Sequence, residues 1–253
     1  MTPYYADDSV TLYLGDALAV LRTIPDASID AVITDPPYSS GGLMRGDRAT
    51  AGSHGKYQGD AVNLLPEFGG DSRDQRSYAY WCALWMSECR RVTKPAGLLL
   101  AFTDWRQLPA TTDAVQSGGW VWRGLVPWYK PNTRPQSGRF TAQCEYVVWA
   151  SSGAMPVDRS RGTFPGFYQY GPERNKEHVT QKPLGLMRDL ISIVPEEGLI
   201  LDPFMGAGTT GVAALTSRRR FIGVEMADHY CRVAEQRIRA AGAQTAIDFD
   251  GAA

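Results

Sequence analysis

LILDPFMGAGTTG, residues 199–211, is the stretch that decides the fold of this 253-residue chain. Three apolar residues lead into Asp202, glycines follow at positions 206 and 208, and a helix is expected to begin near Thr209. Glycines let a backbone turn tightly and approach a ligand closely, and the free N–H groups at the start of a helix attract an anionic group. The stretch therefore predicts a strand, a ligand-binding turn and a helix in succession.

An acidic residue ends the next predicted strand, FIGVE, at Glu225, seventeen residues beyond Gly208. A carboxylate at that place can accept hydrogen bonds from ribose hydroxyls, as in nucleotide-binding α/β folds. The glycine pair alone could form an ordinary tight turn, whereas the pair together with the terminal acid indicates a nucleoside cofactor. GAGTT lacks the third glycine of a GxGxxG motif, which argues against a dinucleotide.

The same alternation of short apolar runs and segments of helical period extends along the chain. It predicts an α/β fold with a mostly parallel sheet and helices on both faces. The predicted strands are Val10–Leu14, Ala31–Thr34, Leu98–Phe102, Val121–Trp128, Tyr146–Ala150, Leu199–Asp202 and Phe221–Glu225. The predicted helices are Ala17–Ile24, Ser77–Val92, Trp105–Ser117, Leu184–Val194, Thr209–Ser217 and Asp228–Ala241.

A second chemical motif, Asp35-Pro36-Pro37-Tyr38, directly follows the predicted strand Ala31–Thr34. The two prolines stiffen the turn and remove two N–H donors, so that the Asp35 carboxylate and the Pro36 carbonyl remain as fixed acceptors. Such acceptors suit an exocyclic amine, and the ring of Tyr38 offers a face for a flat base. The alternative interpretation is a rigid loop with a helix-capping Asp and a surface Tyr.

The net charge of −1 averages two unlike parts of the chain. Residues 106–182 contain ten basic and five acidic side chains, so this region carries +5 and the rest carries −6. No run approaches the roughly 18–20 apolar residues of a membrane span, and the N-terminus has no leader pattern, so we expect a soluble cytoplasmic protein. Four cysteines without a CxxC pair indicate neither a disulfide framework nor a metal site.

The motifs, in their order, resemble the amino-methylating DNA methyltransferases that use S-adenosylmethionine. The resemblance is to the β group, in which the catalytic tetrapeptide precedes the cofactor glycines. Protein-glutamine methyltransferases have the opposite order, and C5-cytosine methyltransferases need a Pro-Cys nucleophile that none of the four cysteines provides. The matched segments are residues 15–38, 92–102, 126–150 and 178–183, together with DPFMGAGTT and FIGVE.

The resemblance implies a Rossmann-like methyltransferase fold with circularly permuted motif order, the cofactor S-adenosyl-L-methionine and no metal. Asp35 and Pro36 would hold the target amino group while Tyr38 stacks on the base, and Pro37 would complete the catalytic tetrapeptide. Asp16 would lie near the cofactor adenine, although it could instead cap the helix that starts at Ala17. The other cofactor-binding residues would be Asp202, Pro203, Phe204, Gly206, Gly208, Thr209, Thr210, Glu225, Thr180, Gln181 and Lys182.

The resemblance further implies methyl transfer to N6 of adenine in double-stranded DNA, after the base has been flipped out of the helix. N4 of cytosine is the alternative target, because either amine fits the same acceptors. A catalytically idle DNA-binding relative is a third interpretation, and an NAD-dependent oxidoreductase would leave the DPPY turn unexplained. A homodimer and a cognate restriction endonuclease are further expected partners.

Basic residues that alternate with aromatics and glycines in the middle of the chain predict the DNA contacts. We expect a single catalytic domain over residues 1–242 and a frayed tail over 243–253. A mobile loop over 39–75 is expected near the active site, and 151–177 is expected to be a small target-recognition insert. The predicted DNA-binding residues are Arg134, Arg139, Arg159, Arg161, Arg174 and Lys176.

Overall fold

A computed structural model describes most of the chain. It covers residues 1–38, 73–133, 135, 137–158, 160, 162–171 and 181–250, the last seven for the backbone alone. Its strands are β1 (Tyr5–Ala6), β2 (Val10–Leu14), β3 (Ile29–Thr34), β4 (Thr93–Thr103), β5 (Val121–Tyr129), β6 (Cys144–Ser151), β7 (Tyr168–Gln169), β8 (Leu199–Asp202) and β9 (Arg220–Glu225). Its helices are α1 (Ala17–Leu21), α4 (Gln75–Val92), α5 (Leu108–Ser117), α6 (Leu184–Ile191), α7 (Thr209–Thr216) and α8 (Asp228–Asp250).

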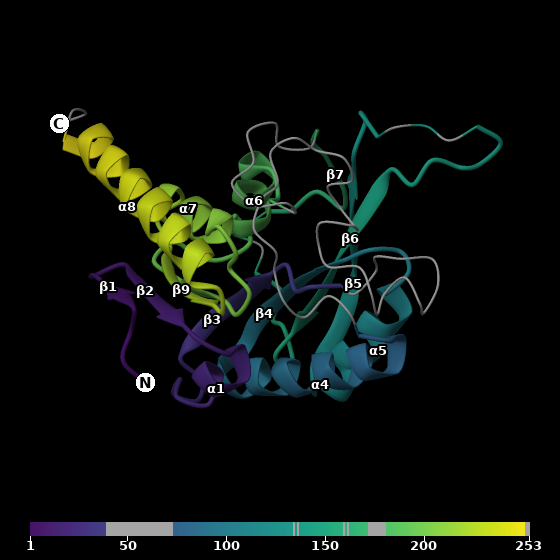
Figure 1. The fold of residues 1–253 in the computed structure, drawn as a ribbon, viewed down its shortest axis with the longest axis horizontal. Helices are drawn as coiled ribbons and strands as arrows, with labels where there is room; N and C mark the ends of the chain where they lie inside the picture. Colours follow the sequence, from purple (N-terminus) through teal and green to yellow (C-terminus); the bar gives the residue numbers. More distant parts are fainter. Residues whose placement is uncertain are drawn as a thin grey trace.

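The strands form one sheet in the order β1-β2-β9-β8-β3-β4-β6-β5-β7. Its centre, from β2 to β4, is parallel, while β6 runs antiparallel to both β4 and β5. Helices α6, α7 and α8 cover one face, and α1, α4 and α5 cover the other (Figure 1). The architecture is the Rossmann-like fold of S-adenosylmethionine-dependent methyltransferases, as the sequence predicted.

The burial of each element explains its place in the sheet. β3 is buried at five of its six positions, which is typical of a central parallel strand with helices on both faces. Helix α4 buries Tyr78, Cys82, Trp85 and Cys89, which recur at helical spacing on one face. The opposite face of the sheet packs on α6, α7 and α8 through residues that include Leu186, Ile191, Val212, Ala234 and Ile238.

Parallel strands end at a common edge of the sheet, and the residues of the two predicted motifs lie at this edge. Thr34 of β3 pairs with Ala101 of β4, and Asp202 of β8 pairs with Gly223 of β9. Because β6 reverses the chain, β5 runs in the same direction as β4 and its end, Tyr129, lies at the same edge. Open α/β sheets bind ligands at the carboxyl ends of their strands.

All seven predicted strands and all six predicted helices are present, with ends that differ by up to nine residues. The sequence missed β1 and β7, which have two residues each and show no periodicity of their own. β7 lies in the expected recognition insert 151–177, which is otherwise without regular structure over its described residues. Residues 39–72 of the expected loop 39–75 lie outside the described residues. Its last residue, Gln75, is the first residue of α4.

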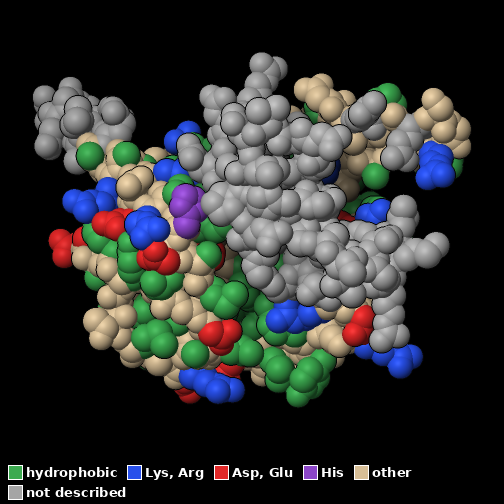
Figure 2. Space-filling view, in the orientation of Figure 1, with side chains coloured by type: hydrophobic (Ala, Val, Ile, Leu, Met, Phe, Trp, Pro, Cys, Tyr) green, Lys and Arg blue, Asp and Glu red, His purple; other side chains and the backbone are tan. Residues whose placement is uncertain are grey.

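The predicted end of the last helix is wrong. The sequence placed it at Ala241, with a frayed tail over 243–253, but α8 continues to Asp250. Gly242 does not end the helix, because one glycine in an otherwise alanine-rich helix costs only about 1 kcal/mol. Acidic and basic side chains alternate on the α8 side of the molecule (Figure 2), in part as the pairs Arg232–Asp228 and Arg239–Glu235.

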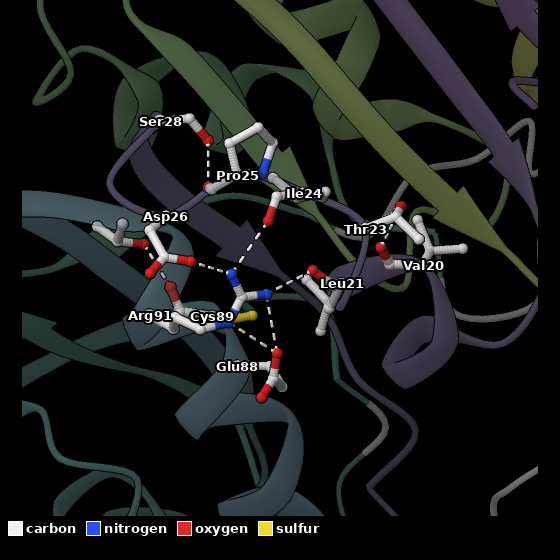
Figure 3. A network of polar contacts seen from close by, with 11 residues as sticks. Val20, Leu21, Thr23, Ile24, Pro25, Asp26, Ser28, Glu88, Cys89 and Arg91 are labelled. Atoms are coloured by element: carbon white, nitrogen blue, oxygen red, sulfur yellow. Dashed lines mark hydrogen bonds and ion pairs between the residues drawn. The ribbon is translucent and has the colours of Figure 1, made fainter. Parts of the chain in front are cut away.

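A polar network joins α1 to the end of α4 on one face of the sheet (Figure 3). The guanidinium group of Arg91 donates to the carbonyl oxygens of Leu21 at 2.8 Å and Ile24 at 3.1 Å. It also pairs with Glu88 at 2.9 Å and with Asp26. Leu21 is the last residue of α1 and Ile24 lies in the turn after it, so one cation ties the end of α1 and this turn to α4.

Replacement of Arg91 by methionine removes donors to two backbone carbonyls and two carboxylates. We expect the Arg91→Met variant to lose about 1–3 kcal/mol of unfolding free energy, measured by urea denaturation. The control is Arg232→Met, which breaks only the exposed Arg232–Asp228 pair and should change stability by less than about 0.5 kcal/mol. Equal losses in the two variants would contradict a specific role for the Arg91 network.

Candidate active site

The two motifs that the sequence singled out meet in one cavity of about 200 Å³. The cavity opens at the carboxyl edge of the sheet, between the turn after β3 and the turn after β8. Of the predicted residues, its lining includes Asp16, Asp35, Pro36, Pro37, Tyr38, Gln181, Lys182, Asp202, Pro203, Phe204, Gly206, Thr209, Thr210 and Glu225. Thr180, which was predicted beside the cofactor, lies outside the described residues.

Gly208 is the predicted cofactor residue that does not line the cavity. It adopts a left-handed conformation (φ 76°), and it is the N-cap of α7. A Cβ atom at this position would come within 2.9 Å of the Ala234 Cβ and 3.2 Å of Ile238. Glycine is therefore required here because the backbone turns and α8 packs closely against it, while Gly206 forms the part of the turn that faces the cavity.

Glu225 ends β9 at the cavity, as predicted. Its carboxylate accepts hydrogen bonds from the backbone N–H groups of Gly206 at 3.1 Å and Ala227 at 2.8 Å. Burial raises the pKa of Glu225 above its usual value, and the backbone donors oppose this shift. The side chain is thus fixed by the glycine turn itself, with acceptor capacity left toward the cavity.

Asp16 caps α1, as the alternative interpretation predicted, and it also lies at the cavity. Its carboxylate accepts a hydrogen bond from the Ala19 N–H at 3.0 Å and so caps α1. The same residue lines the cavity beside Leu18 and the exposed Met226. This end of the cavity offers two apolar side chains next to a carboxylate, an environment that suits a flat heterocycle with polar edges.

An aromatic wall on the α4 side of the cavity was not predicted. The ring of Phe204 lies 5.2 Å from the rings of both Trp81 and Trp85, and the Arg73 guanidinium lies 4.3 Å above Trp81. Arg73 and Trp81 also line the cavity. The available signal was the sequence YWCALW in a predicted helix, where two tryptophans four residues apart share one face.

Asp202 connects the two turns. Its carboxylate accepts hydrogen bonds from Thr34 Oγ1 at 2.7 Å, from Thr210 Oγ1 at 2.6 Å and from the Phe204 N–H at 3.0 Å. Thr34 immediately precedes Asp35, and Thr210 lies in the first turn of α7. Burial raises the pKa of Asp202 to about 6. Asp202 therefore joins the end of β3 to the glycine turn and to the first turn of α7.

The DPPY turn presents Asp35 to the same cavity. Tyr38 Oη donates a hydrogen bond to Asp35 Oδ1, and Lys182 Nζ lies 2.5 Å from Asp35 Oδ2. Burial raises the pKa of Asp35, Lys182 acts in the opposite direction, and the nearby Glu145 carboxylate adds to the rise. Asp35 is therefore a buried acceptor with a protein cation as its counter-ion.

Lys182, which was predicted among the cofactor-binding residues, lines the cavity and contacts the DPPY turn. Its ammonium group lies between two carboxylates, 2.5 Å from Asp35 and 3.4 Å from Glu145. The rings of Tyr38 and Phe102 flank it, with centroids at 5.3 and 5.1 Å. The sequence missed Glu145 altogether, although a lone acid in the apolar strand CEYVVWAS was a usable signal.

The predicted DNA-binding residues lie almost entirely outside the described part of the chain. Of the six, the structure describes Arg139, which is exposed in the connection between β5 and β6, next to the fully exposed Phe140. Arg134, Arg159, Arg161, Arg174 and Lys176 lie outside the described residues.

The described residues contain no cluster of three or more His, Cys, Asp or Glu side chains that could hold a metal ion. None of the helices in this part of the chain is long and apolar enough to cross a membrane.

The fold and the site define the class of protein: an amino-methyltransferase of the DPPY type, with the catalytic turn before the cofactor turn in sequence. The chain belongs to the DNA methylase family of N6 and N4 methyltransferases, whose family model matches residues 29–160 and 158–236. The predicted family is thereby confirmed, and the chain is a DNA methyltransferase.

Individual relatives agree with this assignment. The type II methyltransferase M.HinfI of Haemophilus influenzae is 29% identical over 253 residues, which covers 90% of this chain and 68% of that protein. The cytosine-N4-specific PvuII DNA methyltransferase has the same fold, with a TM-score of 0.69 at 20% identity over 96% of this chain and 94% of that one. M1.HpyAVI in complex with S-adenosylmethionine gives a TM-score of 0.65 at 23% identity, over 90% and 98% of the two chains.

The raised pKa of Asp202 predicts a pH-dependent stability. Between its ordinary pKa near 4 and its folded pKa of about 6, the folded state binds the extra proton, so the unfolding free energy falls as pH rises through this window. Asp202→Asn removes the titrating group and keeps one acceptor. We expect the stability difference, variant minus wild type, to grow by about 2–3 kcal/mol from pH 4 to pH 7 in urea denaturation. A difference that does not change with pH would contradict this prediction.

Proposed function

We propose that this chain transfers a methyl group from S-adenosyl-L-methionine to N6 of adenine in double-stranded DNA. The observation that carries the proposal is the shared cavity, whose lining includes both the Asp35 carboxylate and Glu225 with the glycine turn. The same cavity thus offers acceptors for an amino group and a carboxylate for a ribose. Methyl transfer requires an amine and a methyl donor to be held side by side in this way.

The residues around the cavity fit S-adenosylmethionine. Glu225 retains acceptor capacity for ribose hydroxyls, and Asp16 with its apolar neighbours suits an adenine ring. Phe204 and Gly206 form the adjoining wall, and the hydroxyls of Thr209 and Thr210 lie beyond it. When bound, this cofactor supplies an activated methyl group that a neutral amine can accept by direct displacement.

Asp35 would act on the amine. Its carboxylate and the Pro36 carbonyl can each accept one N–H of an exocyclic amino group, which orients the nitrogen lone pair. As the C–N bond forms and the methyl–sulfur bond breaks, the nitrogen becomes positively charged and must release a proton, which the Asp35 carboxylate would accept. Tyr38, half-buried beside Asp35, is placed to stack on the base after rearrangement of its hydrogen bond.

DNA would enter from the carboxyl edge of the sheet. A paired base is inaccessible, so the target nucleotide must rotate out of the duplex, at a cost of a few kcal/mol that contacts in the site offset. We assign phosphate contacts to Arg139 and to the five predicted basic residues outside the described part of the chain. We assign sequence recognition to residues 151–177. A homodimer and a cognate restriction endonuclease stay predictions from the sequence.

N4 of cytosine is the second candidate target, because the acceptors of the DPPY turn fit either amine. The experiment that decides is incubation of the purified chain with plasmid DNA and tritiated S-adenosylmethionine, followed by mass spectrometry of the nucleosides. We expect N6-methyladenine. N4-methylcytosine would transfer the assignment to the second target, and the absence of any methylated nucleoside would support a catalytically idle DNA-binding relative.

Loss of the catalytic carboxylate should separate chemistry from cofactor binding. We expect Asp35→Ala to lower the methyl-transfer rate at least about a hundredfold, because the amine loses the charged acceptor that orients it. Its affinity for S-adenosylmethionine, measured by calorimetry, should stay within about threefold of wild type, a difference below 1 kcal/mol.

Glu225→Ala is the matched variant in the same cavity. Loss of a charged acceptor should weaken S-adenosylmethionine binding by about tenfold or more. At saturating S-adenosylmethionine, the methyl-transfer rate of Glu225→Ala should return toward that of the wild type, whereas the rate of Asp35→Ala should stay low. Normal turnover in Asp35→Ala would overturn the role of that residue, and an unchanged affinity in Glu225→Ala would overturn the role of Glu225.

A further inference from the structure

Four charged side chains form a partly buried chain that begins in the DPPY turn and includes the buried Lys182. They alternate in sign, as Asp35, Lys182, Glu145 and Lys130, with contact distances of 2.5, 3.4 and 2.8 Å in that order. They come from four segments that meet at the carboxyl edge: the turn after β3, the residue before Pro183 and α6, the start of β6 and the end of β5. The sequence predicted Asp35 and Lys182 as site residues, whereas Lys130 and Glu145 lie in the matched segment 126–150 without a predicted role.

The Glu145 carboxylate is held by contacts with Lys130 and Lys182. Lys130 Nζ donates to Glu145 Oε1 at 2.8 Å, and the side chains of both residues are 20% exposed. Lys130 also lies 5.4 Å from the ring of Trp128, the residue that pairs with Glu145 across β5 and β6. Burial alone would raise the pKa of Glu145, but Lys182 and Lys130 together bring it below its usual value. Glu145 is therefore a stable anion.

Lys182 is the shared member of the chain. Its side chain is 6% exposed, and burial alone would lower its pKa, but Asp35 and Glu145 together raise it. A buried ammonium group must retain a carboxylate partner, since an unpaired buried charge is strongly unfavourable. When Asp35 accepts the proton of the methylated amine, it ceases to be such a partner. Glu145 is then the second counter-ion that Lys182 already contacts.

We propose that Glu145, held by Lys130, is a positioning residue of the active site that shares Lys182 with Asp35 and so controls how strongly Lys182 pairs with the catalytic carboxylate. This inference rests on the proposed function for the identity of Asp35 as the acceptor. The sharing keeps Asp35 available to the amine, because Lys182 divides its attraction between two carboxylates. Glu145 also remains a carboxylate partner of Lys182 after the proton has moved.

The proposal predicts shifts of opposite sign in the pKa of Asp35. The charged groups around Asp35 in the described residues are Lys182, Glu145, Tyr38 and Asp202. Glu145→Gln keeps the shape of the side chain and removes a negative charge, so the pKa of Asp35 should fall. Lys182→Met removes the positive charge, so the pKa of Asp35 should rise.

The principal measurement is the pH dependence of kcat, with plasmid DNA and tritiated S-adenosylmethionine at saturation. Activity should decline as pH falls through the pKa of Asp35, which is the acidic limb of the profile. We expect this limb to move to lower pH by about half a unit or more in Glu145→Gln, and to higher pH by about one unit or more in Lys182→Met. Lys130→Met leaves Lys182 as the lysine that Glu145 contacts, so Glu145 should draw Lys182 away from Asp35. The acidic limb of the Lys130→Met profile should therefore also move to higher pH.

Lys94→Met is the matched control. Lys94 pairs with Asp30 at 2.7 Å, in an ion pair at the start of β3 and β4, away from the carboxyl edge. The acidic limb of the kcat profile of Lys94→Met should coincide with that of the wild type. Thermal melting and calorimetric binding of S-adenosylmethionine establish that each variant is folded. A reduced plateau with an unmoved limb in Glu145→Gln would show a merely structural role and would overturn the proposal.

Carboxyl-carbon NMR of protein labelled at aspartate gives a second reading that requires no activity. The Asp35 signal is the one that disappears in Asp35→Ala, and its titration in the free protein should move in the same directions as the kinetic limbs. An inactive wild type with these NMR shifts would refute the proposed function and retain the charge sharing. An active wild type without them would refute the charge sharing alone.

Discussion

The carboxylate of Asp202 is the interaction on which the geometry of the site depends. It accepts hydrogen bonds from Thr34 at the end of β3 and from Thr210 in the first turn of α7, and it is 2% exposed. Through these bonds, the turn that carries Asp35 and the glycine turn are fixed to one buried group. Burial of this carboxylate is unfavourable, as its pKa of about 6 indicates. The compensation is a fixed distance between the two turns, which a direct displacement reaction needs.

The fold could be predicted from the sequence because its main signals are local. β3 and α4 could be predicted because their apolar residues follow a pattern typical of a buried strand and of a helix with one buried face. The same holds for the other long elements. The failures occurred where the local signal was weak or ambiguous. β1 and β7 exist only because a neighbouring strand pairs with them, and Gly242 lies within a helix although glycine is a common stop.

The site could be predicted only in part, for a related reason. Asp35 and Glu225 stand at strand ends within recognisable motifs, and the structure brings them to one cavity. The contact between Lys182 and Asp35 joins residues 147 positions apart, which no spacing rule reveals. Gly208 shows a second limit, since a glycine that accommodates a helix and a glycine that accommodates a ligand look the same in sequence.

The charge distribution of the chain has a different meaning once the buried network is known. Residues 106–182 carry a net charge of +5, which composition alone would assign to contact with DNA. Two of the ten basic side chains, Lys130 and Lys182, are instead engaged with Glu145 and Asp35 inside the site. Approach of the DNA phosphates would raise the pKa of a buried carboxylate, because negative charges repel. The two internal lysines oppose this effect, so that the basic middle of the chain helps to keep Asp35 ionised.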